Sequence, residues 1–502
     1  MTTMLGQMPV VLQPGFQTAQ LMAAGQMTIE QLHAAHQEQI DRVNPGVNAV
    51  IAHNFNTSLH QLLRSSQSTN PSLVESMPLY AVPAAIKACV PVSGFPDTQA
   101  GTKKNGAIAE RNAPIVQRLF ESGALPSMIT NLPPRSSSFT THNSPKGGAG
   151  FGTTHNPYNL DHTCYGSSGG VAAAITTGMA TLGLGFSIAG SVQLPAHGCG
   201  VYALTLSPAL ASCAGHFPGT ETVRHMAVPG LFARHPRDLS LALPSIIGHD
   251  NSPHQNRQLA LNARQQKKPE DINIGVTSGL GDLIADDDTL KLLEILKERL
   301  VKLGYNVHDK HLNSNFAEEL WYVSGGLFSA QVGPSMGFMG RLFFKYMSGL
   351  KEHASDWAYY KGLLENLSGD SFSNYMALMH RRDGLFNIRD QLLNDYDYII
   401  MPSAISAAPK EPLNAKTVLV NGEEYPVAVG LGAFGTVGNI LGVPVASVPI
   451  GFSELGLPVG IQMLGKPQDD ANLLAVVNHM HENEAVPGWQ PAEWVVKRGL
   501  RQ

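Results

Sequence analysis

Residues 152–196 read GTTHNPYNLDHTCYGSSGGVAAAITTGMATLGLGFSIAGSVQLPA, and this stretch decides the fold. It holds two serine sites in glycine-rich backbone: Ser167 and Ser168 precede two glycines, and Ser191 follows an alanine and a glycine. Small residues around a serine let main-chain N–H groups approach a bound carbonyl oxygen, as an oxyanion hole requires. The apolar segment 171–184 between the two sites predicts a buried helix that runs towards a strand.

The serines also lie in a long uncharged region, because residues 163–220 contain no Asp, Glu, Lys or Arg. Such a run predicts burial almost throughout, in a low-dielectric interior. The best candidate base is Lys87, a single ammonium in the apolar run AVPAAIKACVPVSG. Burial without a partner favours the neutral amine, which is a base, and a Ser–Lys pairing is a variant of the catalytic triad.

These motifs resemble the signature of the amidase signature family, whose usual form is close to GGSSGGS…D-x-GGS-x-R-x-PA. The rest of the chain agrees with the family in order and spacing: VPAAIK at 82–87, GTTHNPYN at 152–159, GLFARHPRDLSLAL at 230–243, DYDYIIMPS at 395–403 and GNILGVPVASVPIGFSELGLPVGIQMLG at 438–465. The resemblance implies an α/β fold, in which a mixed twisted β-sheet is covered on both faces by many α-helices. It also implies a single amidase signature domain over residues 1–502.

The resemblance assigns roles to residues of this sequence. Lys87 resembles the catalytic lysine, Ser167 the bridging serine that follows a cis peptide in the family, and Ser191 the nucleophile. The oxyanion hole would be formed by the main-chain N–H groups of Ile188, Ala189, Gly190 and Ser191. The AGS form of the nucleophile motif is similar to that of family members that hydrolyse amide-linked nylon oligomers, the 6-aminohexanoate cyclic dimer hydrolase type.

The chain departs from the family pattern around the triad. The usual aspartate four residues before the nucleophile is Ser187, and the usual arginine two residues after it is Gln193. Two lysines of neighbouring motifs are replaced by Thr205 and Ile129. Because one acid and one base are lost together, we expect Ser187 and Gln193 to form a neutral hydrogen-bonded replacement. Ser168 belongs to the same second layer of residues around the triad.

The family also divides the chain into regions. Residues 1–75 are expected to form an N-terminal helical layer, with a helical pattern over 18–42 and Thr28 as a cap. Residues 76–245 form the catalytic core. Residues 312–390 are expected to form a variable helical region on the substrate side, with most aromatic side chains in the core and one or two at the ligand. Asn439, in a glycine-flanked loop, could face a substrate amide, but the sequence favours a role in capping a turn.

Composition limits the partners of the protein. The 502 residues carry a net charge of −5, which gives no electrostatic case for binding nucleic acid. The four cysteines show no disulfide or metal spacing and indicate reduced thiols in a cytoplasmic protein. The uncharged segment 171–190 could pass for a membrane span, but its Gly, Thr and serine motif favour a buried core. We therefore expect a small-molecule amide as partner, no metal or other cofactor, and a homodimer as an open possibility.

Other functions fit the sequence less well. A Ser-His-Asp hydrolase would need a GxSxG elbow, which GSVQL does not provide, and His197 alone is weak evidence. The HMH sequence at 479–481 lacks metal-site spacing. The function that the sequence favours is hydrolysis of a carboxamide by a Ser–cis-Ser–Lys triad through an acyl-enzyme. A weakened or inactive scaffold with this fold, and an amidotransferase component that transamidates glutamyl-tRNA, remain alternatives.

Overall fold

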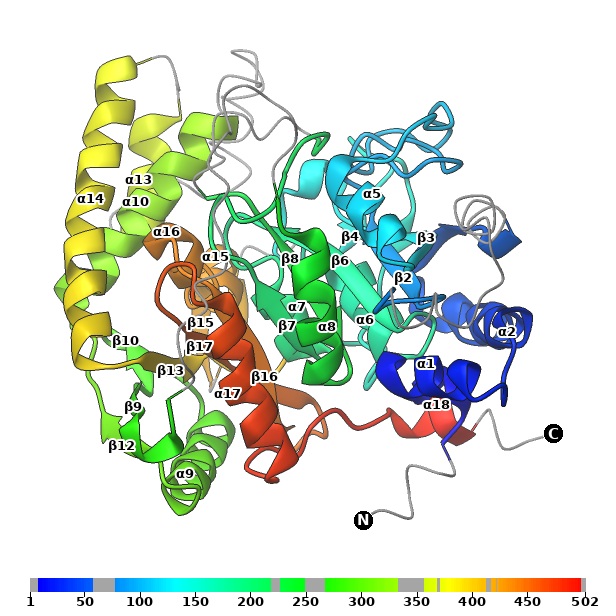
Figure 1. Ribbon diagram of the computed structural model, residues 1–502. Helices are drawn as coiled ribbons and strands as arrows, with labels where there is room; N and C mark the ends of the chain where they lie inside the picture. Colours follow the sequence, from blue (N-terminus) through cyan, green and yellow to red (C-terminus); the bar gives the residue numbers. More distant parts are fainter. Residues whose placement is uncertain are drawn as a thin grey trace.

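The computed structural model of the chain describes residues 8–56, 77–217, 226–248, 267–332, 356–367, 371–411, 417–420 and 422–497. An eleven-stranded sheet forms the centre of this part of the chain (Figure 1). Its strands follow one another in the order β1 (Val50–His53), β3 (Leu125–Thr130), β2 (Pro83–Lys87), β6 (Leu182–Ser187), β8 (Val228–Ala233), β7 (Tyr202–Thr205), β16 (Val445–Phe452), β17 (Pro458–Leu464), β13 (Tyr398–Pro402), β9 (Asn273–Val276) and β12 (Asn306–Asp309). The sheet is mixed: β2 runs parallel to β3 and β6, whereas β6 and β8 are antiparallel. The predicted mixed α/β sheet is confirmed.

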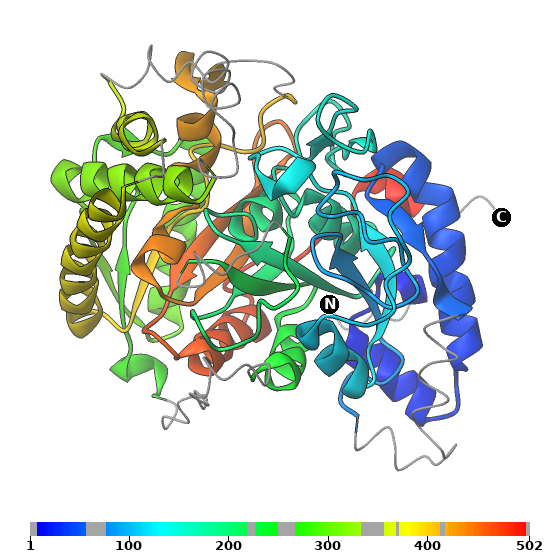
Figure 2. The same cartoon turned by 90° about the horizontal axis from the view of Figure 1, so that it is seen from above.

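Helices pack on both faces of the sheet. One face carries α5 (Pro114–Glu121), α8 (Pro236–Ile246), α9 (Asp287–Lys302) and α17 (Asp470–Glu482), which share a hydrophobic core with it. The other face carries α6 (Gly169–Thr176) and α7 (Gln193–Gly198), with α2 (Ile29–Val47) packed outside them. At one end of the molecule lie α10 (Ser314–Val332), α13 (Ala358–Asn366) and α14 (Phe372–Asp395), while α1 (Gly15–Ala23) and α2 lie at the opposite end (Figures 1 and 2).

The sequence of β6, LGLGFS, explains how α6 reaches the sheet. Successive side chains of a strand point to opposite faces, so the large residues point to one face and the two glycines to the other. A Cβ atom at Gly183 would lie 2.4 Å from Val171 of α6, and one at Gly185 would lie 2.8 Å from the Ser168 hydroxyl. The glycines therefore let α6 pack directly on the strand, which brings Ser167, just before this helix, close to the sheet.

The N-terminal helical pattern divides into two helices rather than running over 18–42. Residues 24–28 separate α1 from α2, and Thr28 caps α2 through a reciprocal hydrogen-bond pair with Gln31. The predicted cap is therefore confirmed, but the single helical pattern across it is not. Residues 1–7 and 57–75 of this layer lie outside the described residues.

The uncharged segment 171–190 is not a membrane-spanning helix. It consists of most of α6, the strand β6 and the turn that follows. Among the helices in the described ranges, none has the length and apolar character needed to cross a bilayer.

Candidate active site

The side chains of Lys87 and Ser167 are in contact. Lys87 is the last residue of β2, and Ser167 lies directly before the capping residue of α6. Lys87 Nζ donates a hydrogen bond to Ser167 Oγ at 2.6 Å and a second to the Phe186 carbonyl at 3.3 Å. Burial lowers the pKa of Lys87 to about 8. The Gly166–Ser167 peptide bond is cis, as the resemblance implies.

Ser191 lies in the turn between β6 and α7, which covers residues 188–192. Gly190 in this turn has φ +95°, and a Cβ atom there would lie 2.7 Å from Gly435 Cα. Only glycine allows both this conformation and this close approach. Ser191 is half-buried, and its hydroxyl has no hydrogen-bond partner among the described residues.

One cavity connects the three candidate catalytic residues. It has a volume of about 190 Å³, and Lys87, Ser167 and Ser191 all line it. Ile188 and Ala189 line it as well. No hydrogen-bond partner is present within the described ranges for the main-chain N–H groups of Ile188, Ala189 and Ser191. A carbonyl group bound here would therefore meet a nucleophile, a buried base and unengaged N–H donors in one place.

The rest of the cavity wall is largely apolar and comes from distant parts of the chain. The apolar and aromatic lining residues are Phe139, Phe186, Ala227, Phe328, Tyr359, Tyr360, Leu363 and Ala428. From the described part of the aromatic helical region 312–390, the aromatic residues Phe328 of α10 and Tyr359 and Tyr360 of α13 line the cavity. Sequence reasoning also did not single out Ser136–Ser138 and His216, which line it too. No sequence pattern marked His216.

Gly190 does not contribute its N–H group to this cavity. The Gly190 N–H donates to Ser187 Oγ at 3.1 Å and lies 3.3 Å from Asn439 Oδ1. Gly190 is also absent from the cavity lining, unlike its neighbours on both sides. Of the four N–H groups expected to form the oxyanion hole, those of Ile188, Ala189, Gly190 and Ser191, the Gly190 N–H is thus the one that is directed to Ser187 and Asn439.

The neutral replacement for the family's charged pair is present as a hydrogen-bonded cluster. The Ser187 hydroxyl lies 3.1 Å from Gln193 Oε1 and 2.8 Å from Asn439 Oδ1, and all three side chains are buried. The contact expected between Ser187 and Gln193 is confirmed. Asn439 was expected to cap a turn or face a substrate; instead its side chain contacts the turn that carries Ser191.

The two other replaced positions have no visible substitute for the lost lysines. Thr205 is buried in β7, and its hydroxyl has no hydrogen-bond partner in the described part of the chain. Ile129 in β3 packs within the hydrophobic core. Neither residue lines the candidate active-site cavity.

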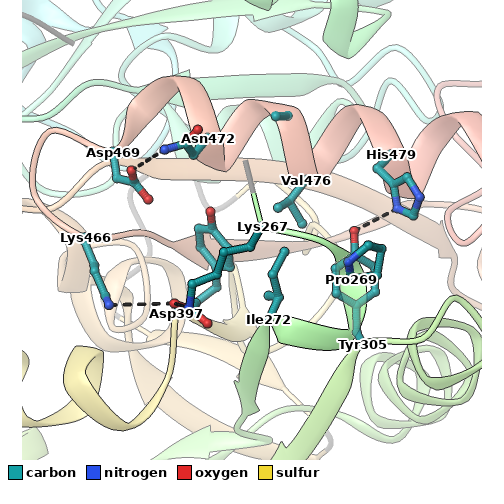
Figure 3. A pocket seen from close by; sticks show the side chains of 12 residues that line it. Lys267, Pro269, Ile272, Tyr305, Asp397, Lys466, Asp469, Asn472, Val476 and His479 are labelled. Atoms are coloured by element: carbon teal, nitrogen blue, oxygen red, sulfur yellow. Dashed lines mark hydrogen bonds and ion pairs between the residues drawn. The ribbon is translucent and has the colours of Figure 1, made fainter. Parts of the chain in front are cut away.

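A second cavity, of about 240 Å³, lies beside α17 near the β13–β9–β12 edge of the sheet (Figure 3). Several polar side chains meet in it, as Figure 3 shows: Lys267 and Lys466 lie 2.7 and 3.7 Å from the Asp397 carboxylate, Tyr305 contacts His479, and Asn472 contacts Asp469. No candidate catalytic residue lines this cavity. In the described residues, His479 and His481 belong to no group of side chains that could hold a metal ion.

Comparison with known proteins identifies the family of the chain. The model of the Amidase family matches residues 31–474. Fatty-acid amide hydrolase 2 of Homo sapiens is 25% identical, with 96% of this chain and 90% of that protein covered. The 6-aminohexanoate-cyclic-dimer hydrolase of Paenarthrobacter ureafaciens is 26% identical, with 96% and 95% covered.

The fold also matches a solved structure. The structure of 6-aminohexanoate cyclic dimer hydrolase superposes with a TM-score of 0.78 at 22% identity, over 97% of this chain and 100% of that one. At this identity the match shows the common fold. Together with the family match over most of the chain, it leads to one conclusion: the chain belongs to the amidase signature family and is a hydrolase that acts on amides.

Proposed function

We propose that this amidase hydrolyses a carboxamide by a Ser191–Ser167–Lys87 triad. The observation that carries the proposal is the 2.6 Å contact between Lys87 and Ser167 at the wall of the cavity that Ser191 lines. A buried lysine whose pKa is about 8 is partly neutral near neutral pH, so it can accept a proton.

The reaction proceeds in two halves. Ser191 Oγ attacks the carbonyl carbon, its proton moves to Ser167, and the Ser167 proton moves to Lys87. When the tetrahedral intermediate collapses, the proton returns through Ser167 to the leaving amine and an acyl-enzyme remains. Water then attacks the acyl group through the same relay, which releases the carboxylic acid and restores Ser191.

The negative charge on the carbonyl oxygen is held by main-chain donors. We assign this role to the N–H groups of Ile188, Ala189 and Ser191. Donors that are fixed before the charge appears stabilise the transition state more than the substrate. The reaction then uses only side chains, backbone N–H groups and water.

The cavity favours an uncharged substrate with an apolar acyl group. Among the residues that the structure describes, the ionisable side chains that line it are Lys87, His216, Tyr359 and Tyr360, and none of them is a carboxylate or a guanidinium. A glutamyl group on tRNA carries an ammonium, which would find no carboxylate partner among the described lining residues. We therefore prefer a fatty or aromatic amide over the amidotransferase alternative.

We propose that the enzyme works in the cytoplasm.

A homodimer through the N-terminal helical layer is the assembly that we would test first, by size-exclusion chromatography with light scattering. A monomer at micromolar concentration would remove that part of the proposal without affecting the chemistry.

The direct test is labelling with a fluorophosphonate probe followed by peptide mapping. We expect an adduct on Ser191 in the wild type and its loss in Lys87→Ala, because the serine is not activated without the base. An adduct on another serine, or equal labelling in Lys87→Ala, contradicts the triad. No adduct at high probe concentration favours the inactive scaffold.

A further inference from the structure

Asn439 connects the C-terminal part of the chain to the turn that carries Ser191. It lies in the short helix α16 (Val437–Leu441), and its side chain is 2% exposed. Its Nδ2 donates to the Ser187 carbonyl at 3.1 Å and to the Met226 carbonyl at 2.9 Å. Its Oδ1 accepts from the Gly190 N–H at 3.3 Å and lies 2.8 Å from the Ser187 hydroxyl.

These partners fix the orientation of the amide. Two carbonyl oxygens can only accept, so they require the NH₂ group, and a main-chain N–H can only donate, so it requires the oxygen. A primary amide is the side chain that supplies two donors and an acceptor within this reach. Aspartate would place an oxygen against the Ser187 and Met226 carbonyls, and an aliphatic residue would leave buried polar groups without partners.

The contacts hold the turn on both sides of the proposed oxyanion donors. Ser187 directly precedes Ile188, and Gly190 directly follows Ala189. Because Gly190 directs its N–H towards Asn439 and Ser187, the turn keeps the N–H groups of Ile188 and Ala189 at the cavity. An oxyanion hole depends on donors that do not reorganise during the reaction.

We infer that Asn439 is a positioning residue for amide hydrolysis, which holds the 188–190 turn in the geometry that binds the oxyanion. This inference rests on the proposed function, since it concerns the same oxyanion hole. Ser187 and Gln193 stand where the family has its charged pair, and the Asn439 Oδ1 atom lies within hydrogen-bond distance of both side chains.

Asn439 is itself held from the helical region at the end of the molecule. Arg382 of α14 donates from Nε to the Ile440 carbonyl at 2.8 Å and from a terminal nitrogen to the Asn439 carbonyl at 3.2 Å. Arg389, about two turns further along α14, donates to the Leu441 carbonyl at 2.8 Å. Cations are favourable at the carbonyl end of a helix. The contacts thus link α14 through α16 to the nucleophile turn.

The test compares the rate and affinity of fluorophosphonate labelling in Asn439→Asp, Asn439→Ala and the control Asn366→Ala. Asn366 is also a buried asparagine, but its side chain donates within α13, to the Gly362 carbonyl, away from the turn. The phosphoryl oxygen of the probe occupies the oxyanion hole when Ser191 attacks. We expect the maximal labelling rate of the Asn439 variants to fall by about 10–10³-fold, up to the loss typical of removing one oxyanion donor. The half-saturating probe concentration should stay near the wild-type value, and Asn366→Ala should label like the wild type.

Three results would overturn the inference. The first is labelling of Asn439→Asp at the wild-type maximal rate, the second is a change in its half-saturating concentration alone, and the third is an equal loss of rate in Asn366→Ala. If the Asn439 variants do not fold by circular dichroism, Ser187→Ala, which removes one small group of the same cluster, replaces them with the same expectation. A wild type that is not labelled at Ser191 refutes the proposed function first, and the inference with it.

Discussion

Lys87 Nζ and Ser167 Oγ lie 2.6 Å apart although 80 positions separate them in the chain. The contact exists because β2 and β6 are parallel neighbours and α6 packs on the glycine side of β6. The lysine at the end of one strand and the serine before the helix therefore meet in an interior where the ammonium form is disfavoured. A buried amine beside a hydroxyl at the cavity wall is the arrangement that a proton relay needs.

Labelling and hydrolysis should depend on pH through Lys87. Burial lowers the pKa of Lys87 to about 8, and only the neutral amine, which predominates above that pH, can accept the relay proton. The second-order rate constant of labelling should therefore fall about tenfold for each pH unit below the pKa of Lys87 and level off above it. The measurement is a pH profile of fluorophosphonate labelling at low probe concentration. A profile that is flat across neutral pH, or an identical profile in the residual activity of Lys87→Ala, would contradict the role of Lys87.

The two adjacent serines, Ser167 and Ser168, should behave very differently. Ser167→Ala removes the group between Lys87 and Ser191, so we expect activity to fall by about 10²–10⁴-fold, the usual contribution of proton transfer. Ser168→Ala is the matched control. The Ser168 hydroxyl is as buried as that of Ser167, but it donates a long hydrogen bond of 3.4 Å to the Phe186 carbonyl, and the loss of this bond should cost little stability. Steady-state rates of both variants decide the matter. Equal losses would mean that the relay is not specific to Ser167.

Much of the framework follows from residues that the sequence displays. The uncharged run predicts burial, the apolar segment 171–184 predicts a buried helix that runs towards a strand, and a single lysine in an apolar run indicates a candidate base. These patterns are local, so one sequence is enough to identify them. The helix break at 24–28 was missed because the apolar spacing continues across it.

The residues that line the active-site cavity, and those that contact the turn that carries Ser191, could not be predicted in the same way. Phe328, Tyr360 and His216 come from separate elements, and only the packing of those elements decides which aromatic residue faces the cavity. The contacts of Asn439 could not be predicted for the same reason, because its partners Ser187 and Gly190 are about 250 positions away. The partners of the Gly190 N–H could not be predicted either, because a sequence motif does not show the direction of an N–H group.

Restoring the family's charged pair should reveal the coupling between positions 187 and 193. Ser187→Asp alone buries a carboxylate and Gln193→Arg alone buries a guanidinium, at sites where both native residues are fully buried. Each single variant should therefore lose stability and activity, while the double variant should recover part of both because the two charges can pair. Thermal unfolding and labelling rates of the four proteins give the coupling. Additive effects would show that the two side chains do not interact.

Enlarging the apolar wall should change substrate preference without changing the chemistry. Phe328 and Phe316 both lie on α10, but Phe328 lines the active-site cavity, whereas Phe316 is buried in the hydrophobic core and does not line it. Phe328→Ala should shift the best substrate in a series of linear acyl p-nitroanilides towards longer chains, because the removed ring leaves space for additional methylene groups. Each buried methylene is worth about 0.8 kcal/mol, so the gain should be about fourfold per added carbon until the space is filled. Phe316→Ala should lower the melting temperature and leave the chain-length preference of kcat/KM unchanged. The same shift in both variants would mean that general loosening, and not the cavity wall, sets the preference.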